Sequence, residues 1–439
     1  MKPTFLQTRR EFLSTGIKGI GLLTASAYVP AFLTRTAAAA APGTDSRILV
    51  VIQLSGGNDG LNTVIPFADD LYYKARPVIG IKADSTLKIN DHLGLHSALA
   101  PMKGEFDQGK MAIIGNVGYP NPNRSHFQSM EIWHTAEDSG PDARHEVTGW
   151  LGRYFDAQCS GADPHVKTDQ GSIGMSFGKV MPQAFRNTAN VGIALDNPDT
   201  FQWNASGETA GLAKQQEAIF AKLNNPAASS TDMMNLTNLG GISGDEPETL
   251  DFLKHTAMNA IVAGDRLRAI LSKSRDRTIY PKTGLSNQLE MIGRLIAGNF
   301  PTRVYYAVQG GFDTHANQPG TQAKLLGDLA SSVHAFLQDL RTQKNSDRVT
   351  VLAFSEFGRR VAENASAGTD HGTAAPMFLF GDSIKGGLHG NPPDLQNLGD
   401  GDLKYQVDFR QVYATVLENW LETDSSLVLR RKFPKIDVI

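Results

Sequence analysis

Polar and ionisable side chains follow directly after three apolar runs of the sequence. Asn58 and Asp59 come after RILVVIQL, Asp313 and His315 come after TRVYYAVQ, and Glu356 comes after VTVLAF. In an extended chain Asp313 and His315, two positions apart, point the same way. A carboxylate beside an imidazole is a ligand pair for hard to borderline divalent metals. The spacing therefore predicts a divalent metal site at Asp313 and His315, with a metal-free hydrogen-bonded pair as the alternative.

Further ionisable residues surround the last of these runs. Glu356 and Arg359 follow it, and His371 precedes the next apolar run, MFLF. Ligand sites of open parallel sheets form at the carboxyl ends of strands. We therefore expect an acid, a guanidinium and an imidazole at one edge of a sheet. The stretch SGGND after the first run is explained equally well by a simple Asx turn.

Ser125 begins a predicted helix and has two interpretations. Ser125 and Gln128 form the pattern of a capping box, which explains the serine without chemistry and is the favoured interpretation. A hydroxyl at a helix N-terminus also lies where unpaired N–H groups stabilise an anion, such as a phosphoryl or sulfuryl group. Arg124 and His126, on either side of the serine, support this second interpretation.

The stretch GMSFG, which contains Ser176, matches the G-x-S-x-G pattern of serine esterases. A nucleophile elbow requires a strong strand before the motif and a helix after it. Here the preceding residues are mostly polar, and Pro182 comes four residues after the motif. This context disfavours Ser176 as a nucleophile.

The apolar runs also predict the fold. RILVVIQL is almost continuously apolar, which is typical of a central parallel strand. A strand at 302–309, a helix at 319–342 and a strand from Val349 form a parallel crossover unit. The sequence therefore predicts an α/β fold with a mostly parallel central sheet flanked by helices. One domain is expected over residues 46–439, with irregular insertions roughly over 137–300, where the periodic signals weaken.

The first 40 residues are expected to be an export signal rather than part of this fold. Thr8–Leu13 form a twin-arginine signature, which is followed by a mild apolar stretch and a small-residue cleavage region. The apolar stretch is short for a membrane span, and an uncleaved anchor is the alternative. We therefore expect a periplasmic or secreted protein, with the twin-arginine export machinery as a partner and no stable membrane insertion after cleavage.

Charge and cysteine content restrict the partners and the metal ligands. The leader has five basic residues and one acid, so its removal takes the net charge from −3 to −7. A net acidic chain argues against nucleic acid or an anionic membrane as a partner. Cys159 is the only cysteine, so any metal site has to use oxygen and imidazole ligands. The twin-arginine route carries proteins that are already folded and often loaded with a cofactor, which also indicates a metal.

Five stretches of the sequence carry a resemblance to a known family. They are RILVVIQLSGGNDGLNTVIP, YPNPNRSHFQSMEIWHTA, GGFDTH, SEFGRR and DHGTAAPMFLFG. Behind a twin-arginine leader, they resemble the exported family catalogued as domain of unknown function 1501, from about Arg47 to Trp420. More distantly, the order of these sites is similar to that of the alkaline phosphatase and sulfatase superfamily. This resemblance implies an alkaline-phosphatase-like fold.

The superfamily resemblance implies roles for residues in the first three stretches. An acid after the first strand binds metal in that superfamily, which implies Asp59 or Asn58 as a ligand here. A nucleophile at a helix start implies Ser125. Asp313 and His315 would belong to one metal site.

The same resemblance implies roles later in the chain. Glu356 would stand at the strand end where the superfamily commonly has an Asp-His pair, and His371 would be a late metal ligand. Phe357 stands where a metal-binding histidine is expected, so one metal site would be lost and Arg359 would supply positive charge instead. The residues after Cys159 lack the formylglycine signature, which argues against a standard sulfatase.

Together these residues predict an exported metal-dependent hydrolase of phosphate or sulfate esters, acting on a small anionic ester. Ser125 would be the nucleophile with His126 beside it, and Arg124 or Arg359 would hold the anion. A divalent cation, either zinc or one of magnesium, manganese and calcium, would stabilise the leaving oxygen. The alternative is a non-catalytic exported binding or assembly protein that retains the fold.

Overall fold

The structure, a computed structural model, describes residues 47–137, 148–160, 174–178, 180–186, 192–195, 267, 269–272 and 278–439. The export signal expected at 1–40 and much of the region expected to hold insertions lie outside these residues. Contacts divide the chain into two compact units, and nearly all described residues belong to the unit formed by 41–168, 172–196 and 270–439. A single domain over 46–439 therefore stays a prediction.

A central sheet organises this unit, and the described residues contribute nine strands to it. Its order is β11-β5-β10-β9-β1-β8-β6-β7, with β12 also paired to β5. All of these strands run in one direction except β10, which is antiparallel to both of its neighbours. The strands are β1 (Ile48–Leu54), β5 (Met111–Gly118), β6 (Gly174–Phe177), β7 (Gly192–Leu195), β8 (Val304–Gln309), β9 (Val349–Phe354), β10 (Ala375–Phe380), β11 (Gly387–His389) and β12 (Val407–Asp408).

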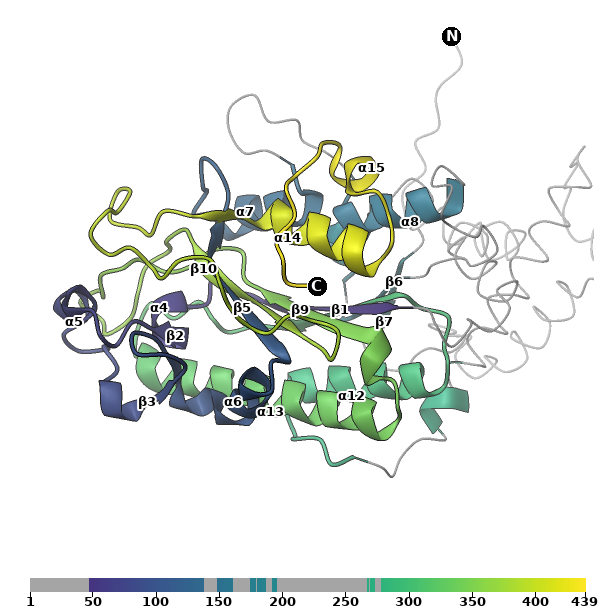
Figure 1. Ribbon diagram of the computed structural model, residues 1–439, viewed down its shortest axis with the longest axis horizontal. Coiled ribbons are helices and arrows are strands. Elements are labelled where there is room, and N and C mark those ends of the chain that lie inside the picture. The colour runs from purple at the N-terminus through teal and green to yellow at the C-terminus, as the bar shows by residue number, and fades with distance from the viewer. Residues whose placement is uncertain are drawn as a thin grey trace, which may run out of the picture. The chain divides into compact units, whose positions relative to one another are not determined.

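Helices cover both faces of the sheet (Figure 1). One face carries α7 (His126–Thr135), α8 (Trp150–Ser160), α14 (Phe409–Thr415) and α15 (Ser425–Leu429). The other carries α6 (Ala100–Asp107), α12 (Gly284–Ala297) and α13 (Gln318–Thr342). The predicted α/β class, with a mostly parallel sheet flanked by helices, is confirmed.

Shorter elements complete the described part of the chain. A small second sheet joins β2 (Val64–Ile65), β4 (Gly94–His96) and β3 (Thr86–Lys88). The remaining helical turns are α4 (Gly60–Thr63), α5 (Asp70–Ala75), η1 (Ala83–Ser85), η2 (Ser97–Leu99), η3 (Gln183–Phe185), η6 (Ser346–Arg348) and the π-helical η7 (Val416–Trp420). None of the described helices combines the length and the apolar character that a membrane crossing requires.

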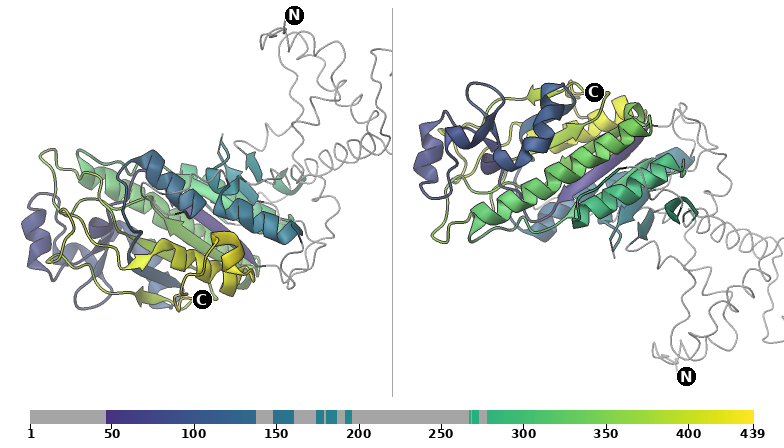
Figure 2. Two further views of the ribbon diagram at one scale, coloured as in Figure 1. Left: turned by 90° about the horizontal axis from the view of Figure 1, so that it is seen from above. Right: turned by 90° about the horizontal axis from the view of Figure 1, so that it is seen from below.

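Strand β1 lies between β8 and β9 and is parallel to both. All seven of its residues are buried, which explains why its sequence does not alternate. The chain leaves β8, returns through α13 and enters β9, so the predicted crossover unit is confirmed. The right-hand view in Figure 2, seen from below, shows α13 as the long green helix that runs along the purple strand β1.

The antiparallel direction of β10 decides where the loop before it lies. Strand β9 ends at Phe354 and β10 begins at Ala375. Because the two strands run in opposite directions, the residues between them stay at the carboxyl ends of β1, β8 and β9. A polar segment after β9 and a histidine before β10 therefore meet at the same edge of the sheet.

The region predicted to hold insertions contributes two strands to the central sheet. Strand β6 pairs with β8, and β7 pairs with β6. Each is only four residues long, too short for a clear periodic signal in the sequence. Ser176 lies inside β6 and is buried, so GMSFG does not form a nucleophile elbow.

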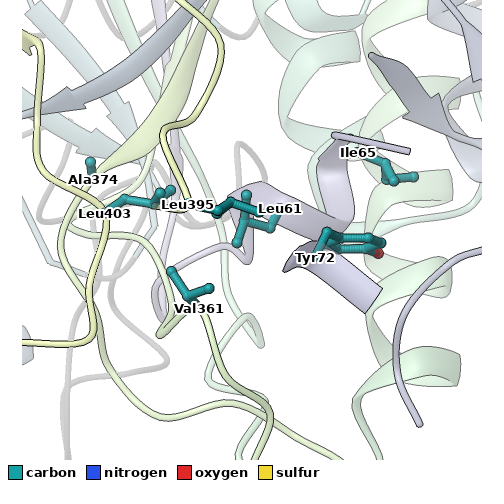
Figure 3. Packing of buried hydrophobic residues seen from close by; sticks show 7 residues of the cluster. All are labelled: Leu61, Ile65, Tyr72, Val361, Ala374, Leu395 and Leu403. Carbon is teal, nitrogen blue, oxygen red and sulfur yellow. The ribbon is translucent and has the colours of Figure 1, made fainter. Parts of the chain in front are cut away.

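A small apolar cluster fixes the loops at the carboxyl edge of the sheet to α4 and α5. Figure 3 shows its members, which come from α4, β2 and α5 and from two long loops much later in the sequence. They are Leu61, Ile65, Tyr72, Val361, Ala374, Leu395 and Leu403. All seven are buried. Because Val361 and Ala374 belong to the loop between β9 and β10, this loop is anchored to the cluster at two points.

Candidate metal centre

The turn after β1 brings the first strand end against the loop that follows β8. Gly56 and Gly57 adopt φ values of 121° and 77°, which side chains other than glycine rarely tolerate. A Cβ atom at Gly56 would lie 2.4 Å from the backbone nitrogen of Asp313. Gly56 is therefore required for this close approach.

Arg359 holds three loops together at this edge. Its guanidinium donates to the backbone oxygens of Gly56, Gly57, Phe312 and Thr369 and to Oδ1 of Asp313, at 2.7 Å. The side chain is fully buried. These bonds do not fit the prediction that Arg359 holds a substrate anion, because its donors are already used by the protein.

Asp59 and Asn58 are likewise committed to the protein. Oδ2 of Asp59 accepts from Arg76 at 2.6 Å and from Gln318 at 2.5 Å, while Oδ1 accepts from the N–H of Leu61 and caps α4. Oδ1 of Asn58 accepts from the Thr63 hydroxyl. Both side chains are buried away from the cluster described below. The turn interpretation of SGGND therefore fits the geometry, and the metal-ligand interpretation does not.

Three histidines from distant parts of the chain meet beside Asp313. His126 is the first residue of α7, His315 lies in the loop after β8, and His371 lies in the loop before β10. Their Nε2 atoms lie 3.5, 3.0 and 3.0 Å, respectively, from Oδ1 of Asp313. The Nε2 atoms of His315 and His371 are 3.0 Å apart.

The opposite ring nitrogen of each histidine faces an acceptor. Nδ1 of His126 lies 2.9 Å from Oε1 of Glu356. Nδ1 of His371 lies 2.8 Å from the backbone oxygen of Arg124. A backbone carbonyl or an ionised carboxylate only accepts, so these Nδ1 atoms carry the proton. The lone pairs of the neutral rings are then on Nε2, which faces Asp313.

His315 follows the same pattern. Its Nδ1 lies 3.0 Å from Oδ1 of Asp370, and this carboxylate also accepts from Asn364. The pKa of Asp370 is lowered mainly by the hydrogen bond from His315, so the carboxylate is the form that holds the ring. Three imidazoles thus present unprotonated nitrogen atoms to one another and to a carboxylate.

This donor set fits a divalent cation. Nε2 of His126 is buried and has no hydrogen-bond partner among the described residues, and the lone pairs of His315 and His371 repel each other at 3.0 Å unless a cation or a proton lies between them. Tetrahedral zinc with bonds of about 2.0–2.1 Å separates its ligand atoms by roughly 3.3 Å. Four of the six separations among these atoms, from 3.0 to 3.5 Å, bracket that value. His126, Asp313 and His371, whose donor atoms all lie within 4.8 Å of one another, would hold the ion. His315, at 3.0 Å from the donor atoms of both Asp313 and His371, would be the fourth ligand.

Asp313 remains ionised under all ordinary conditions. Its partial burial raises the pKa, but hydrogen bonds from Arg359 and, when its Nε2 carries a proton in place of a cation, from His371 outweigh that effect and lower the pKa to about 2. The side chain is 47% exposed, so the cluster opens to solvent on this side.

Phe357 and Glu356 support the ligands from behind. Glu356 is buried and also accepts from the backbone N–H of Gly56 at 2.8 Å, so it orients His126 rather than occupying the cluster itself. The ring of Phe357 packs against His126 and His371, with centroids 4.9 and 4.8 Å away. Phe357 therefore forms an apolar wall where the superfamily resemblance implied a second metal ligand.

Ser125 stands next to this cluster without capping its helix. It is the residue before α7, but its side chain makes no cap hydrogen bond. Its backbone N–H donates to Asn123, whose side-chain amide donates to Gln128. The capping-box interpretation of Ser125 and Gln128 is therefore wrong, because Asn123 supplies the turn that starts the helix.

Arg124 contributes its backbone to the cluster, not its charge. Its guanidinium is bound by the carboxylates of Asp402 and Asp400. Desolvation lowers the pKa of Arg124, but the hydrogen bonds that it donates to both acids outweigh this effect and raise the pKa. Its carbonyl accepts from His371. The geometry does not fit the prediction that Arg124 holds a substrate anion, because two acids already neutralise the guanidinium.

Two hydrogen-bond partners of the candidate site residues were not predicted from the sequence. Asp370, which orients His315, was detectable as the acid directly before His371 in the DHG run. Arg76, which neutralises Asp59, lies in the exposed-looking stretch DLYYKAR and gave no signal. The role of His126 as a metal ligand, rather than a residue beside the nucleophile, also follows only from the fold.

A family model matches most of the chain. The model for proteins of unknown function named DUF1501 matches residues 46–431. The chain belongs to the DUF1501 family. The resemblance inferred from the five sequence stretches is thereby confirmed. No curated protein is significantly similar to this DUF1501 protein.

Several solved structures resemble the DUF1501 protein at low identity. The C-terminal periplasmic domain of EcEptC from Escherichia coli, in complex with Zn, is 8% identical, with 78% of this chain and 74% of that chain covered and a TM-score of 0.33. A protein in the alkaline phosphatase superfamily from Vibrio parahaemolyticus is 9% identical, with 83% and 71% covered and a TM-score of 0.31. Alkaline phosphatase from the Antarctic bacterium TAB5 is 9% identical, with 76% and 92% covered and a TM-score of 0.30. These TM-scores are low, so nothing in the proposals below depends on them.

Replacement of Glu356 by glutamine should weaken cation binding without unfolding the protein. The amide cannot polarise the Nδ1–H of His126 as a carboxylate does, and loss of such a partner lowers metal affinity by about 10–100-fold. Titration with Zn²⁺ against a chelating indicator measures the effect. The matched control is Glu363→Gln, since Glu363 accepts only from the backbone of Val78 and Ile79. Equal affinities for the two variants would show that Glu356 does not act through His126.

Proposed function

We propose that this protein is an exported hydrolase that requires a divalent cation and cleaves phosphate or sulfate esters. The observation that carries the proposal is the convergence of three imidazole Nε2 atoms on the Asp313 carboxylate, at 3.0 to 3.5 Å. When bound there, a divalent cation would supply Lewis-acid polarisation and neutralise charge on the ester oxygens. Three imidazoles and one carboxylate favour zinc over magnesium or calcium.

The start of α7 offers the groups that an ester substrate requires. Backbone N–H groups at residues 126–128 make no backbone hydrogen bond to the described residues, as expected for the first turn of a helix. They lie at the positive end of a ten-residue helix, where an anionic group is stabilised. Ser125 lies at the same end, and its hydroxyl is not used as a cap. In the proposal Ser125 is the nucleophile and the helix N-terminus binds the anion that the two arginines were predicted to hold.

A serine hydroxyl becomes a nucleophile only when its proton is removed. His126 directly follows Ser125, but its Nε2 would hold the cation and Nδ1 already donates to Glu356, so the ring would not be the base. The pKa of the Ser125 hydroxyl would instead be lowered by a divalent cation bound in the cluster. Asp313, with its lowered pKa, keeps a fixed negative charge there.

The proposal predicts separable effects for two substitutions. Ser125→Ala should retain cation binding and lose at least about tenfold in kcat/KM on generic phosphate and sulfate monoesters, because a positioned nucleophile contributes that much or more. His371→Ala should lose both cation and activity. Steady-state rates and bound-metal analysis of purified mature protein provide the measurement. Full turnover by both variants would remove the proposal.

A cation-dependent binding or assembly protein is the second candidate. The observation in its favour is that Arg124 and Arg359, the two arginines nearest the cluster, are both paired within the protein. Wild-type protein that binds zinc stoichiometrically but turns over neither class of ester would favour this candidate. Twin-arginine export remains part of both proposals and is tested by replacing Arg9 and Arg10 with lysine and following the protein's compartment.

A further inference from the structure

A cavity of about 200 Å³ lies between α4, β5, β10 and the loop after β11. None of the four proposed metal ligands lines it. Its walls are formed largely by apolar side chains and backbone, and they contain no Asp, Glu, Lys or Arg. Among the lining residues are Leu61, Ile113, Asn116, Pro376, Leu388 and His389. A charged ligand would lose its hydration here without a compensating partner, so the cavity suits an uncharged ligand.

The cavity is built by an irregularity in the pairing of β5 and β10. Ala375 pairs with Val117, whereas Met377 pairs with Ile114. Two residues of β5 therefore face only Pro376, which has no N–H to donate. Such a bulge bends the strand and redirects side chains, and bulges are frequent beside binding sites.

Asn116 is one of the two bulged residues. Its φ of 51° is in the left-handed region, which Asn tolerates better than other side chains. Its side chain is largely buried, and Nδ2 donates to the backbone oxygen of Asn391 at 2.9 Å. Oδ1 accepts no hydrogen bond from the described residues. The bulge thus leaves one acceptor without a partner on a mostly apolar wall.

His389 adds a second acceptor at the cavity. Its Nε2 lies 2.8 Å from the backbone oxygen of Lys385, so Nε2 carries the proton. Nδ1 is then the acceptor atom of the ring. The amides of Asn90 and Asn391 also line the cavity, so its polar part is uncharged throughout. The two acceptors on Asn116 and His389 match a ligand with a hydroxyl or N–H donor.

The volume sets the size of the apolar part. An engineered cavity of about 150 Å³ in another protein stays dry and binds benzene. The cavity described above, at about 200 Å³, has room for one ring with a substituent or for a branched alkyl group of similar size.

We propose that this cavity binds a small uncharged ligand with a single-ring or branched alkyl body, whose hydroxyl or N–H group donates to Oδ1 of Asn116. The site is separate from the metal centre and does not depend on the proposed hydrolase function. Its test therefore uses binding rather than turnover.

The experiment compares p-cresol with toluene, which has the same body but no donor. NMR titration of the wild-type protein should show saturable binding of both at millimolar concentration or below. One net hydrogen bond should make p-cresol bind about two- to tenfold tighter. Leu388→Trp should abolish binding by filling the cavity, whereas the matched control Leu427→Trp on α15, where the side chain is 44% exposed, should bind as the wild type does.

A second variant keeps the proposal open to refutation if Leu388→Trp fails to fold. Asn116→Gly tolerates the positive φ and removes the acceptor, so the preference for p-cresol should fall to about one. No saturable binding of either ligand by wild-type protein would overturn the proposal, as would unchanged binding by folded Leu388→Trp. An unchanged preference in Asn116→Gly would overturn the assignment of the acceptor.

Discussion

Asp313→Ala is expected to lower the affinity of the protein for zinc by more than about a hundredfold. Loss of a residue that only orients a ligand costs about 10–100-fold, and Asp313 is the group that all three histidines face, at 3.0 to 3.5 Å. Removing it also removes the only negative charge in direct contact with their Nε2 atoms. Isothermal titration with zinc, in competition with a chelator of known affinity, provides the measurement.

The matched control for this experiment is Asp328→Ala. Asp328 lies on α13, pairs with Lys324 at the surface and has no contact with the cluster. Wild-type affinity is expected for the control, and both variants should retain the wild-type circular dichroism spectrum. If Asp313→Ala bound zinc as the wild type does, the three imidazoles would bind the ion without the carboxylate. The Asp313 carboxylate would then not be required for zinc binding.

The strands that carry the metal centre were predictable because each is apolar along its whole length. Strands β1, β8 and β9 are almost completely buried, so their sequences are apolar runs that end abruptly in polar residues. Asp313 and His315 were found from that boundary together with their spacing. The approach of His371 to Asp313, at 3.0 Å, depends on β10 running antiparallel. The sequence of β10, APMFLF, is as continuously apolar as the sequences of the parallel strands, so it does not reveal the reversed direction.

The sequence could not show that Asp59 and the arginines pair with other groups of the protein rather than with a ligand. A charged residue at a strand end has the same appearance in a sequence whether it binds a ligand or another side chain. Asp59 is neutralised by Arg76, and Arg359 by Asp313, 17 and 46 residues away. Their other hydrogen-bond partners are up to 303 residues away, and such pairings exist only after the loops have packed. Burial then turned two candidate functional groups into structural ones.

The position of His126 was predictable from the sequence, but its contacts were not. Its position at the start of a helix was correctly expected, within one residue of the predicted Ser125. Its function depends on Glu356, 230 residues away, which accepts from Nδ1 and leaves Nε2 directed at Asp313. A histidine becomes a metal ligand through the partner of its second nitrogen, and that partner is set by the fold.

Asp59→Ala is expected to destabilise the protein by about 3–5 kcal/mol, which is the cost of leaving one member of a buried ion pair without its partner. Arg76 and Asp59 are both buried almost completely, with a contact of 2.6 Å. Gln318 would lose its acceptor as well. Equilibrium unfolding in urea, read out by tryptophan fluorescence, measures the change in the free energy of unfolding.

Two further measurements separate this effect from weaker ones. Asp59 also caps α4, and the matched control Asp69→Ala removes only a cap, that of α5, at a cost of about 0.5–2 kcal/mol. The folded fraction of Asp59→Ala should still bind zinc with wild-type affinity, because its carboxylate faces Arg76 and not the histidines. Loss of zinc from folded Asp59→Ala with unchanged stability would restore the interpretation that the first-strand acid is a metal ligand. It would also require the turn after β1 to rearrange when the cation binds.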